Sequence, residues 1–555
     1  MMKSWFRSGA PWIWLNAGAV AVCMIMVVGL LSLIAVRGFA HFWPADVAQV
    51  EVIDTDGNRT EILGEVVRSQ TIPAAVARDA GYIVPDGIEL VTRYLFKQGN
   101  RDQTGRDFAW YTEFGMGEFK YPDNVWVIER REWGNFYGYP VSMTRDGEVL
   151  NVSDSNFWSA VQDSVSRSVR LHNDIRAIER GEIGRINRGI EQLRLDRRSL
   201  DLRNVEGAER EQAEARIAEM NAQLDADYDE LRAELDILYA STQRDSLRMR
   251  MNDGQELDIS LAHIVRVSAP NAMSVPAKLG QYFVRLGEFL THDPREANTE
   301  GGIFPAIFGT VTMVFVMSII VTPFGIFAAI YLREYAKQGL MTRIIRISVY
   351  NLAGVPSIVY GVFGLGFFVY FLGGNIDRLF YEAALPSPTF GTPGLFWASL
   401  TLALLTLPIV IVSTEEGLAR IPSTIRQGSL ALGATKSETL WKVVVPLATP
   451  AMMTGMILAI ARAAGEVAPL MLVGVVKLAP TLPIDGEFPF IHLERKIMHL
   501  GFHIYDVGFQ SPNVEAARPL VYATALVLVL LIIALNLTAI SIRNHLRERY
   551  RSASD

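Results

Sequence analysis

Two charged residues inside an apolar stretch offer the clearest chemistry in this chain of 555 residues. Arg462 and Glu466 are the only Asp, Glu, Lys or Arg side chains within six long apolar runs, and a charge at the centre of a membrane helix costs about 2.5–3.5 kcal/mol on insertion scales. A guanidinium group offers a planar fork of hydrogen-bond donors that matches phosphate-like oxyanions. The carboxylate of Glu466 repels a fully ionised anion but accepts a hydrogen bond from one that still carries a proton. Phosphate carries such a proton near neutral pH and sulfate does not, so the pair predicts a station for phosphate on a path through the membrane.

The same pair also has a purely structural interpretation. Four residues apart, the two side chains lie on one face of a helix, where they could neutralise each other and do nothing more. Residues 459–474 around them are rich in small side chains, which let helices approach closely or leave room for a pathway. We prefer the substrate station, and at the level of the sequence both interpretations stay open.

A second pattern lies in the connection between the fourth and fifth apolar runs, residues 413–450. Its helix start and stop signals predict two short helices that form a compact cytoplasmic knob. The second helix should begin with a capping box, in which Thr and Glu satisfy free backbone N–H groups. The residues concerned are Pro422 at the first helix start, Gly433 at its end, Thr435 and Glu438 in the capping box, and Pro446, which should stop the second helix near Val444. A compact knob joined to two membrane helices would let a motor domain that binds it transmit movement to those helices.

This connection resembles the second half of the EAA motif of ABC importer permeases, EAA-x3-G-x9-I-x-L-P. Gly433 is followed after nine residues by Val443, and then by Val445 and Pro446, so the spacing of the motif is kept. Where the EAA triplet would be, this chain has Gln427, Gly428 and Ser429. The resemblance implies that the knob docks into a cleft of a cytoplasmic ATPase.

The six apolar runs are long enough for helices that cross a bilayer. They cover roughly residues 12–36, 302–332, 349–372, 394–412, 450–473 and 520–542. If the runs alternate in direction, 14 Lys or Arg residues flank them on one side, beginning with Lys3 and Arg7, and five lie in the short connections on the other. The excess of basic residues predicts that both termini are cytoplasmic. The first run is longer than a signal-peptide core and no clear A-x-A site follows it, so we expect an uncleaved anchor.

These runs divide the chain into an anchor (1–36), a periplasmic domain (37–300), a permease domain (301–545) and a cytoplasmic tail (546–555). The periplasmic domain holds 32 basic and 45 acidic residues, a net charge of −13, which argues against nucleic acid as a partner. We predict an α+β domain: strands over 48–155 with turns at Asp56-Gly57 and Asp146-Gly147, a helical hairpin over 156–250 that reverses at 204–207, and a strand pair of 247–251 with 257–267. His172 and His263 are isolated, and no catalytic or metal constellation accompanies them.

A more specific resemblance is carried by residues 461–470, ARAAGEVAPL. They are similar to the ARAAGE-T-APL signature of PstA-type permeases of phosphate ABC importers, with Val467 where Thr is usual, and residues 355–361, VPSIVYG, also resemble that family. The similarity covers about 300–550, and the 37–300 domain is similar to the extra N-terminal domain of long PstA proteins. It implies an α-helical polytopic protein of the inner membrane, with six transmembrane helices and an ABC permease core. The implied partners are a second, PstC-type permease, an ATPase dimer that binds ATP and Mg²⁺, and a periplasmic phosphate-binding protein.

Several other classes find less support in the sequence. No G-x-x-x-x-G-K-[ST] motif occurs, so we expect this chain to bind no cofactor and ATP to bind a separate chain. H-E-x-x-H, C-x-x-C and G-x-S-x-G are likewise absent, and the single cysteine, Cys23, cannot form an internal disulfide. The alternatives are a permease for another oxyanion, a membrane-anchored sensor or scaffold that uses a periplasmic coiled coil, and a catalytic membrane enzyme. The charged pair and the capped knob favour transport, because a scaffold needs neither.

Overall fold

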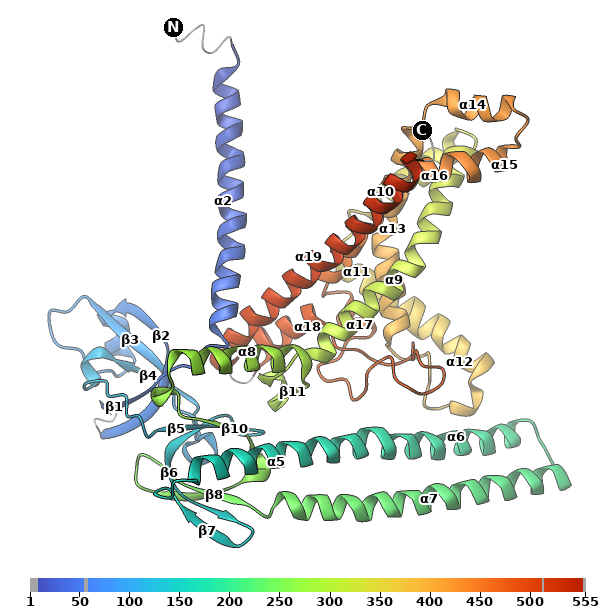
Figure 1. Ribbon diagram of the computed structural model, residues 1–555. Helices are drawn as coiled ribbons and strands as arrows, with labels where there is room; N and C mark the ends of the chain where they lie inside the picture. Colours follow the sequence, from blue (N-terminus) through green and yellow to red (C-terminus); the bar gives the residue numbers. More distant parts are fainter. Residues whose placement is uncertain (1–7, 54–57, 512–513, 553–555) are drawn as a thin grey trace. The chain divides into compact units, whose positions relative to one another are not determined.

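The computed structural model describes residues 8–53, 58–511 and 514–552, and the chain divides into two compact units (Figure 1). Unit 1 consists of Met1–His41, Ile303–Phe380 and Pro388–Asp555. Unit 2 consists of Phe42–Gly302 and the short segment Tyr381–Ser387. Each unit has its own core and is described by itself. Lys3 and Arg7, which entered the orientation argument, lie outside the described residues.

Unit 1 is helical. Its elements are α2 (Ala10–Ala40), α9 (Phe304–Ile330), η6 (Tyr331–Tyr335), α10 (Leu340–Leu352), α11 (Ser357–Phe363), η7 (Gly364–Gly373), α12 (Gly374–Phe380), α13 (Leu395–Ala419), α14 (Ser423–Ala431), α15 (Lys436–Thr439), η9 (Leu440–Val444), α16 (Val445–Gly465), α17 (Leu470–Val473), α18 (Leu500–Tyr505), η10 (Asp506–Gln510) and α19 (Val514–Ser552). The η elements of this unit are π-helical turns that continue a neighbouring α-helix.

Six helical spans in the described part of the chain are long and apolar enough to cross a membrane, as the six runs predict. They are Pro11–Ala40, Phe304–Tyr335, Ser357–Phe380, Leu395–Ala419, Lys436–Gly465 and Ala517–His545. The third and fifth lie elsewhere than predicted. The third starts at Ser357 and not at 349, because the amphipathic helix α10 uses the preceding residues and Pro356 disfavours a helical residue before it. The fifth starts at Lys436 and ends at Gly465, for reasons that concern the site.

The core of unit 1 lies between α9, α13 and α16. Met313, Leu402 and Ala459 belong to one buried apolar cluster that these three helices share with α17. Small residues allow the close approach: a Cβ on Gly455 would lie 1.7 Å from Ser413 Oγ. By contrast, α2 is exposed along almost its whole length and meets α19 only near its end, where a Cβ on Gly38 would lie 3.0 Å from a backbone oxygen of α19. A helix with so few protein contacts suits lipid surroundings.

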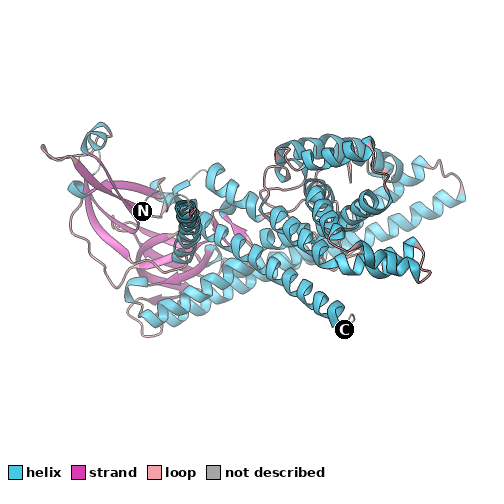
Figure 2. Cartoon of the chain, turned by 90° about the horizontal axis from the view of Figure 1, so that it is seen from above, coloured by secondary structure: helices cyan, strands magenta, loops and turns pink. Residues whose placement is uncertain are grey.

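Within its described residues, unit 2 holds two larger antiparallel sheets (Figure 2) and a two-stranded one made of β11 (Pro294–Arg295) and β12 (Glu300–Gly301). The first has the order β1-β2-β3-β4 and consists of β1 (Val47–Ile53), β2 (Arg59–Pro73), β3 (Leu90–Lys97) and β4 (Phe108–Thr112). The second has the order β10-β5-β6-β8-β9, with β7 also on β6, and consists of β5 (Trp126–Arg130), β6 (Phe136–Arg145), β7 (Glu148–Asn151), β8 (Ser246–Arg250), β9 (Glu256–Ser260) and β10 (Ile264–Ser268). The predicted strand content over 48–155 is therefore correct.

The turns of unit 2 follow the sequence signals closely. Asp146 and Gly147 have φ of 53° and 84° and join β6 to β7 in a two-residue hairpin. Asp56-Gly57 lies outside the described residues. One strand prediction is wrong: residues 257–267 do not form a single partner for β8. They split at the 3-10 turn η3 (Leu261–His263) into β9, which pairs with β8, and β10, which pairs with β5.

The helical hairpin is present as predicted. One arm is α5 (Phe157–Ala177), the π-helical turn η2 (Ile178–Glu182) and α6 (Ile183–Leu202), and the other is α7 (Ala208–Thr242). Its reversal uses positive φ at Asn204 (50°) and Gly207 (73°). Ile175, Ile178 and Leu235 form the buried contact between the arms. A Cβ on Gly189 would lie 3.0 Å from Leu224 Cδ1, so this glycine lets the arms pack closely.

The remaining elements of unit 2 are short apart from one helix, α8 (Val275–Thr291). They are α3 (Ala74–Asp79), α4 (Arg101–Thr104), the 3-10 turns η1 (Glu113–Gly115), η4 (Pro270–Ala272), η5 (Glu296–Asn298) and η8 (Glu382–Ala384), and the two-residue strands β11 (Pro294–Arg295) and β12 (Glu300–Gly301).

Candidate functional site

The apolar run that carries Arg462 and Glu466 is broken in the middle of its signature. Helix α16 ends at Gly465, and Glu466 follows it with an extended backbone (φ −78°, ψ 136°). The chain then runs non-helically to Pro469 and into the single turn α17. The predicted placement of both charges on one continuous helix is therefore wrong. Pro469 explains the break, because it lacks an N–H and disfavours helical backbone at the residue before it.

The pair itself is present. Arg462 Nε lies 3.4 Å from Glu466 Oε1, and the two side chains are 34% and 19% exposed. Arg462 occupies the last turn of α16, where the free carbonyl groups of the helix end stabilise a cation. Among the described residues, Glu466 is its one ion-pair partner, and the contact uses Nε. The terminal nitrogens of the guanidinium thus keep donors that an oxyanion can use.

The fold brings the two signature segments together. Residues 355–361 enter α11, and a Cβ on Gly361 would lie 2.7 Å from the Cα of Pro469, in the break after α16. Tyr360 of the same segment is buried, and its hydroxyl donates to the carbonyl of Leu352 at 2.5 Å. Helix α18, which follows the break in sequence, also contacts it: a Cβ on Gly501 would lie 2.7 Å from a methyl group of Val467. Glycines at both contacts let these two segments approach the break after α16.

Within the membrane-length spans, sequence reasoning missed two buried carboxylates. Glu415 is 8% exposed and forms an ion pair of 2.5 Å with Arg346, while Asp377 is fully buried and accepts backbone N–H groups from Phe390 (2.9 Å) and Gly391 (2.6 Å). Both lie within helical spans that extend beyond the predicted run ends. The sequence could have revealed both carboxylates, because membrane helices continue past the apolar residues that define a run.

The predicted knob forms between α13 and α16. Helix α14 begins after Pro422, and Gly433 follows its end with a φ of 89°. The capping box of α15 is complete: the Glu438 backbone N–H donates to Thr435 Oγ1 at 3.2 Å, and the Thr435 N–H donates to Glu438 Oε2 at 3.0 Å. These local predictions are confirmed in geometry.

Pro446 does not stop the second helix. The helix widens into the π-helical turn η9 and continues as α16, so Lys436–Gly465 is one span. Pro446 lies in the first turn of α16, and a π-helical turn pairs each N–H with a carbonyl five residues back, which relieves the clash that a proline makes in a regular helix. The knob is therefore a direct extension of a membrane helix and not a separate loop.

The base of the knob is fixed to its neighbours. Arg426, which sequence reasoning did not single out, donates to Glu334 Oε1 at the end of η6 (2.9 Å) and to the carbonyl of Leu418 (2.8 Å). Ser429 Oγ lies 2.9 Å from Thr439 Oγ1. Ile330, Leu418, Ile421, Leu440, Val444, Ala448 and Met452 form one apolar cluster beneath it.

The outer surface of the knob is open. Gln427, Gly428 and Gly433 are exposed, and Leu432 is 91% exposed.

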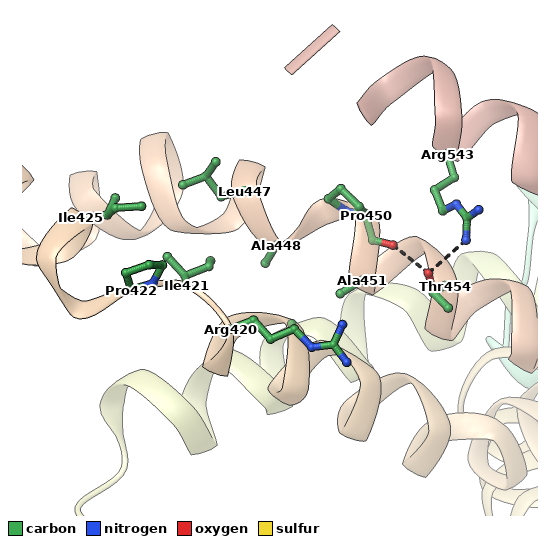
Figure 3. A pocket seen from close by; sticks show the side chains of 11 residues that line it. Arg420, Ile421, Pro422, Ile425, Leu447, Ala448, Pro450, Ala451, Thr454 and Arg543 are labelled. Carbon is green, nitrogen blue, oxygen red and sulfur yellow. Dashed lines mark hydrogen bonds between the residues drawn. The ribbon is translucent and has the colours of Figure 1, made fainter. Parts of the chain in front are cut away.

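A cavity of about 480 Å³ lies beside the knob (Figure 3). Its lining includes Arg420, directly after α13, and Arg543 of α19, and Arg543 donates to Thr454 Oγ1 at 3.4 Å. The cavity is also lined by the first half of α16, from Leu447 to Thr454, whereas Arg462 is in the last turn of that helix, so the candidate substrate station lies outside this cavity. Among the described residues, no group of three or more His, Cys, Asp or Glu side chains could hold a metal ion.

Comparison with known proteins agrees with this geometry. Residues 321–552, which belong to unit 1 apart from the short segment Tyr381–Ser387, match the family model "Binding-protein-dependent transport system inner membrane component". This defines the class, a helical permease of the ABC importer type with about six apolar helices.

Individual relatives narrow the class. The phosphate transport system permease protein PstA of Mycobacterium leprae is 34% identical over 276 residues, which are 49% of this chain and 81% of that protein. PstA 1 of Mycobacterium tuberculosis is 33% identical over 48% of this chain and 79% of that protein. A probable PstA of Methanocaldococcus jannaschii is 29% identical over 43% and 74%. The chain belongs to the family of PstA-type phosphate transport permeases, and membership implies an ATPase and a substrate-binding protein as partners.

Proposed function

We propose that this chain is the membrane-spanning permease subunit of an ATP-driven importer that moves inorganic phosphate across the inner membrane. The observation that carries the proposal is Arg462 at the end of a broken helix, paired with Glu466 through Nε alone among the described residues. Family membership supports the transport class, and relatives named as phosphate permeases support the substrate. In this arrangement both termini are cytoplasmic and residues 37–300 are periplasmic.

The assembly that follows has a second, PstC-type permease beside this chain. An ATPase dimer on the cytoplasmic side binds ATP and Mg²⁺, while this chain binds no cofactor. A periplasmic phosphate-binding protein delivers the substrate. Because PstA-type relatives are permeases, ATP hydrolysis belongs to the separate ATPase chains.

At the station, the two charged groups have unequal tasks. The terminal nitrogens of Arg462 donate two hydrogen bonds to a phosphate ion, and the carbonyl end of α16 helps to hold the cation in place. Glu466 accepts a hydrogen bond from the remaining phosphate proton. Sulfate has no such proton near neutral pH, so its oxygens meet a carboxylate without a bridging hydrogen. The non-helical backbone after Gly465 is acceptable at membrane depth only where it is covered by protein or lines a polar path.

Coupling to the ATPase uses the knob, with Gln427, Gly428 and Leu432 on its open side and Ser429 bonded to Thr439 at its base. Movement of α14 is transmitted through Arg426 to Glu334 and through the apolar cluster below it. Since α15, η9 and α16 form one helical span, movement of the knob also reaches the last turn of α16 and therefore Arg462.

Uptake by proteoliposomes tests this function. The full complex, with radiolabelled phosphate outside and ATP inside, should accumulate phosphate, and omission of the ATPase should abolish accumulation. Arg462→Ala should stop uptake, while Arg378→Ala, at an exposed arginine of the same unit, should not. Equal uptake by the Arg462→Ala complex would contradict the station.

A competition arm separates phosphate from another oxyanion. Sulfate in excess should barely reduce phosphate uptake by the parental complex. Glu466→Gln keeps a hydrogen-bonding group and removes the charge, so this variant should admit sulfate more than it loses phosphate. If the parental complex accumulates sulfate as well as phosphate, it transports oxyanions in general, and Glu466 does not select for the proton that phosphate carries.

A further inference from the structure

Helix α8 of unit 2 presents its polar residues to the protein. Lys278 forms an ion pair with Asp46, and Arg285 Nη2 lies 2.6 Å from Glu129 Oε1. Glu288 forms an ion pair with Arg266 of β10. All of these partners belong to unit 2, so the charged side of the helix is used for attachment to its own domain.

The other side of α8 is apolar and uncovered. Ten of its residues are exposed, and they are Val275, Pro276, Ala277, Leu279, Gly280, Phe283, Val284, Gly287, Leu290 and Thr291. Only Thr291 is polar, and Val275 and Phe283 are 63% and 65% exposed. At 100° per residue these positions cover an arc of about 200°. A surface helix normally buries its apolar face and exposes its charges, so α8 has the reverse arrangement and needs an apolar environment on its free side.

Membrane-length helices come before and after α8 along the chain, and the segment that follows the first of them packs on α8. Phe42 comes two residues after the end of the membrane-length helix α2 and packs on α8, with ring centroids 6.1 Å from Tyr282 and 5.1 Å from Phe289. Trp43 also contacts Tyr282, at 6.4 Å. Beyond Thr291, the next membrane-length helix begins at Phe304. A segment between two spanning helices leaves and re-enters the bilayer on one face, so α8 is held close to that face.

We propose that α8 lies in the plane of the membrane surface, with the exposed apolar arc inserted at the boundary between lipid headgroups and acyl chains. An amphipathic helix of about 25 Å with a wide apolar face buries it about 5–10 Å deep in that region. Trp43 and Tyr282, whose rings contact each other, belong to the two aromatic types that are enriched at the membrane–water interface. The helix thereby fixes which side of unit 2 faces the bilayer, and this holds whichever side of the membrane the unit occupies.

Site-specific fluorescence quenching tests the proposal on the full chain. Cys23 is the single cysteine, so Cys23→Ser gives a background into which one cysteine is placed and labelled with an environment-sensitive nitrobenzoxadiazole probe. Phe283→Cys and Leu279→Cys report on α8. Val149→Cys on β7 is the matched control, because Val149 is an equally exposed apolar residue (61%) of the same unit. The chain is placed in nanodiscs of phosphatidylcholine and phosphatidylglycerol, with and without lipids that carry nitroxide groups.

Nitroxide lipids should quench the two α8 probes at least about twofold and leave the Val149 probe unchanged, since only an inserted helix brings a probe within range. Iodide in the buffer should quench the Val149 probe and spare the α8 probes. Quenching of the α8 probes by iodide alone would mean that the face is bare, and quenching by neither agent would mean that protein covers it. Either result overturns the proposal. Because the substituted residues are exposed, circular dichroism of each labelled chain should match that of the parent.

Discussion

Charged side chains have opposite roles in the two units of this protein. Among the described residues of unit 1, Arg462 pairs only with Glu466 and Glu415 only with Arg346, while a small cluster joins Asp485 to Arg495 and His492 outside the membrane-length spans. In unit 2 the buried charges form connected networks: Glu129 lies 2.6 Å from Arg285 and 3.8 Å from Arg266, which in turn pairs with Glu288.

The electrostatics of Glu129 show how such a network works. Burial raises the pKa of its carboxyl, but the nearby Arg285 and Arg266 outweigh burial and bring the pKa down to about 2. A charge with several partners is stabilised from several directions, so it contributes to the fold. A charge with a single partner in an apolar unit keeps unused hydrogen-bonding groups, and these are what a substrate needs.

Removal of Arg462 should have the largest effect on transport. Arg462→Ala leaves Glu466 alone in the path and removes charge-assisted hydrogen bonds worth about 1.5–3 kcal/mol each, so phosphate uptake should fall by about 100-fold or more. Arg462→Lys keeps the charge and loses the fork, and should recover only part of the uptake. Transport and the amount of assembled complex are measured together.

The control for this prediction is a double change, Arg462→Met with Glu466→Leu. If the pair is only structural, the double variant removes both charges and should restore assembly and transport. If the pair is a substrate station, the complex should assemble and still fail to transport. Phosphate uptake by the double variant at the parental rate would therefore sink the station hypothesis.

The equivalent change in unit 2 should act on stability. Glu129→Ala leaves Arg285 and Arg266 without their shared carboxylate, and breaking a buried pair in this way costs about 3–5 kcal/mol. Pulse proteolysis in urea, read from fragments of unit 2, should show a lower unfolding midpoint. The Asp258→Ala chain is the matched control, because its ion pair with Arg248 is about half exposed and solvent screening leaves such a pair little effect on stability. Equal shifts in the two variants would contradict the importance of the network.

This contrast also explains what the sequence could and could not predict. Caps, turns and apolar runs depend on a few neighbouring residues, so they can be predicted directly from the sequence. This holds for the cap of Thr435 with Glu438, for the reversal at Asn204 and Gly207, and for Arg462 within its apolar run. The networks of unit 2 are not local.

Glu129 and Arg285 are 156 residues apart, and Arg426 finds Glu334 92 residues away. Nothing in the spacing of such residues marks them as partners. The break at Gly465 is an intermediate case, since Pro469 gives a local signal that the continuous apolar composition hides.

A smaller effect is expected from the knob. Gly433→Val places a β-branched residue at a φ of 89°, where an L-residue pays about 1–2 kcal/mol. The end of α14 should move, and phosphate transported per ATP hydrolysed should fall several-fold, while membrane insertion is kept. Gly433→Asn is the matched variant, because Asn tolerates this backbone conformation, and it should retain most of the coupling. An unchanged ratio in the valine variant would count against docking by this segment.

The smallest predicted effect is a pH dependence that belongs to unit 2. Burial, and then the charges of Arg131, Arg176 and Arg180, lower the pKa of His172 from 6.5 to about 4. Between pH 6.5 and 4 the unfolded chain therefore binds a proton that the folded unit refuses, so the stability of unit 2 should fall as the pH decreases through this window and His172 should add no further loss below it. Because His172 is half-buried, solvent screening keeps this contribution modest.

His172→Gln removes the titrating group from the same position. Pulse proteolysis at several pH values should then show a flatter dependence between pH 6.5 and 4 than in the parent. His263→Gln serves as the comparison, since it removes a histidine of the same unit that lies in η3. If the parent and the His172 variant lose stability in parallel over this range, His172 is not the group responsible, and the basic cluster around it does not act on stability through this residue.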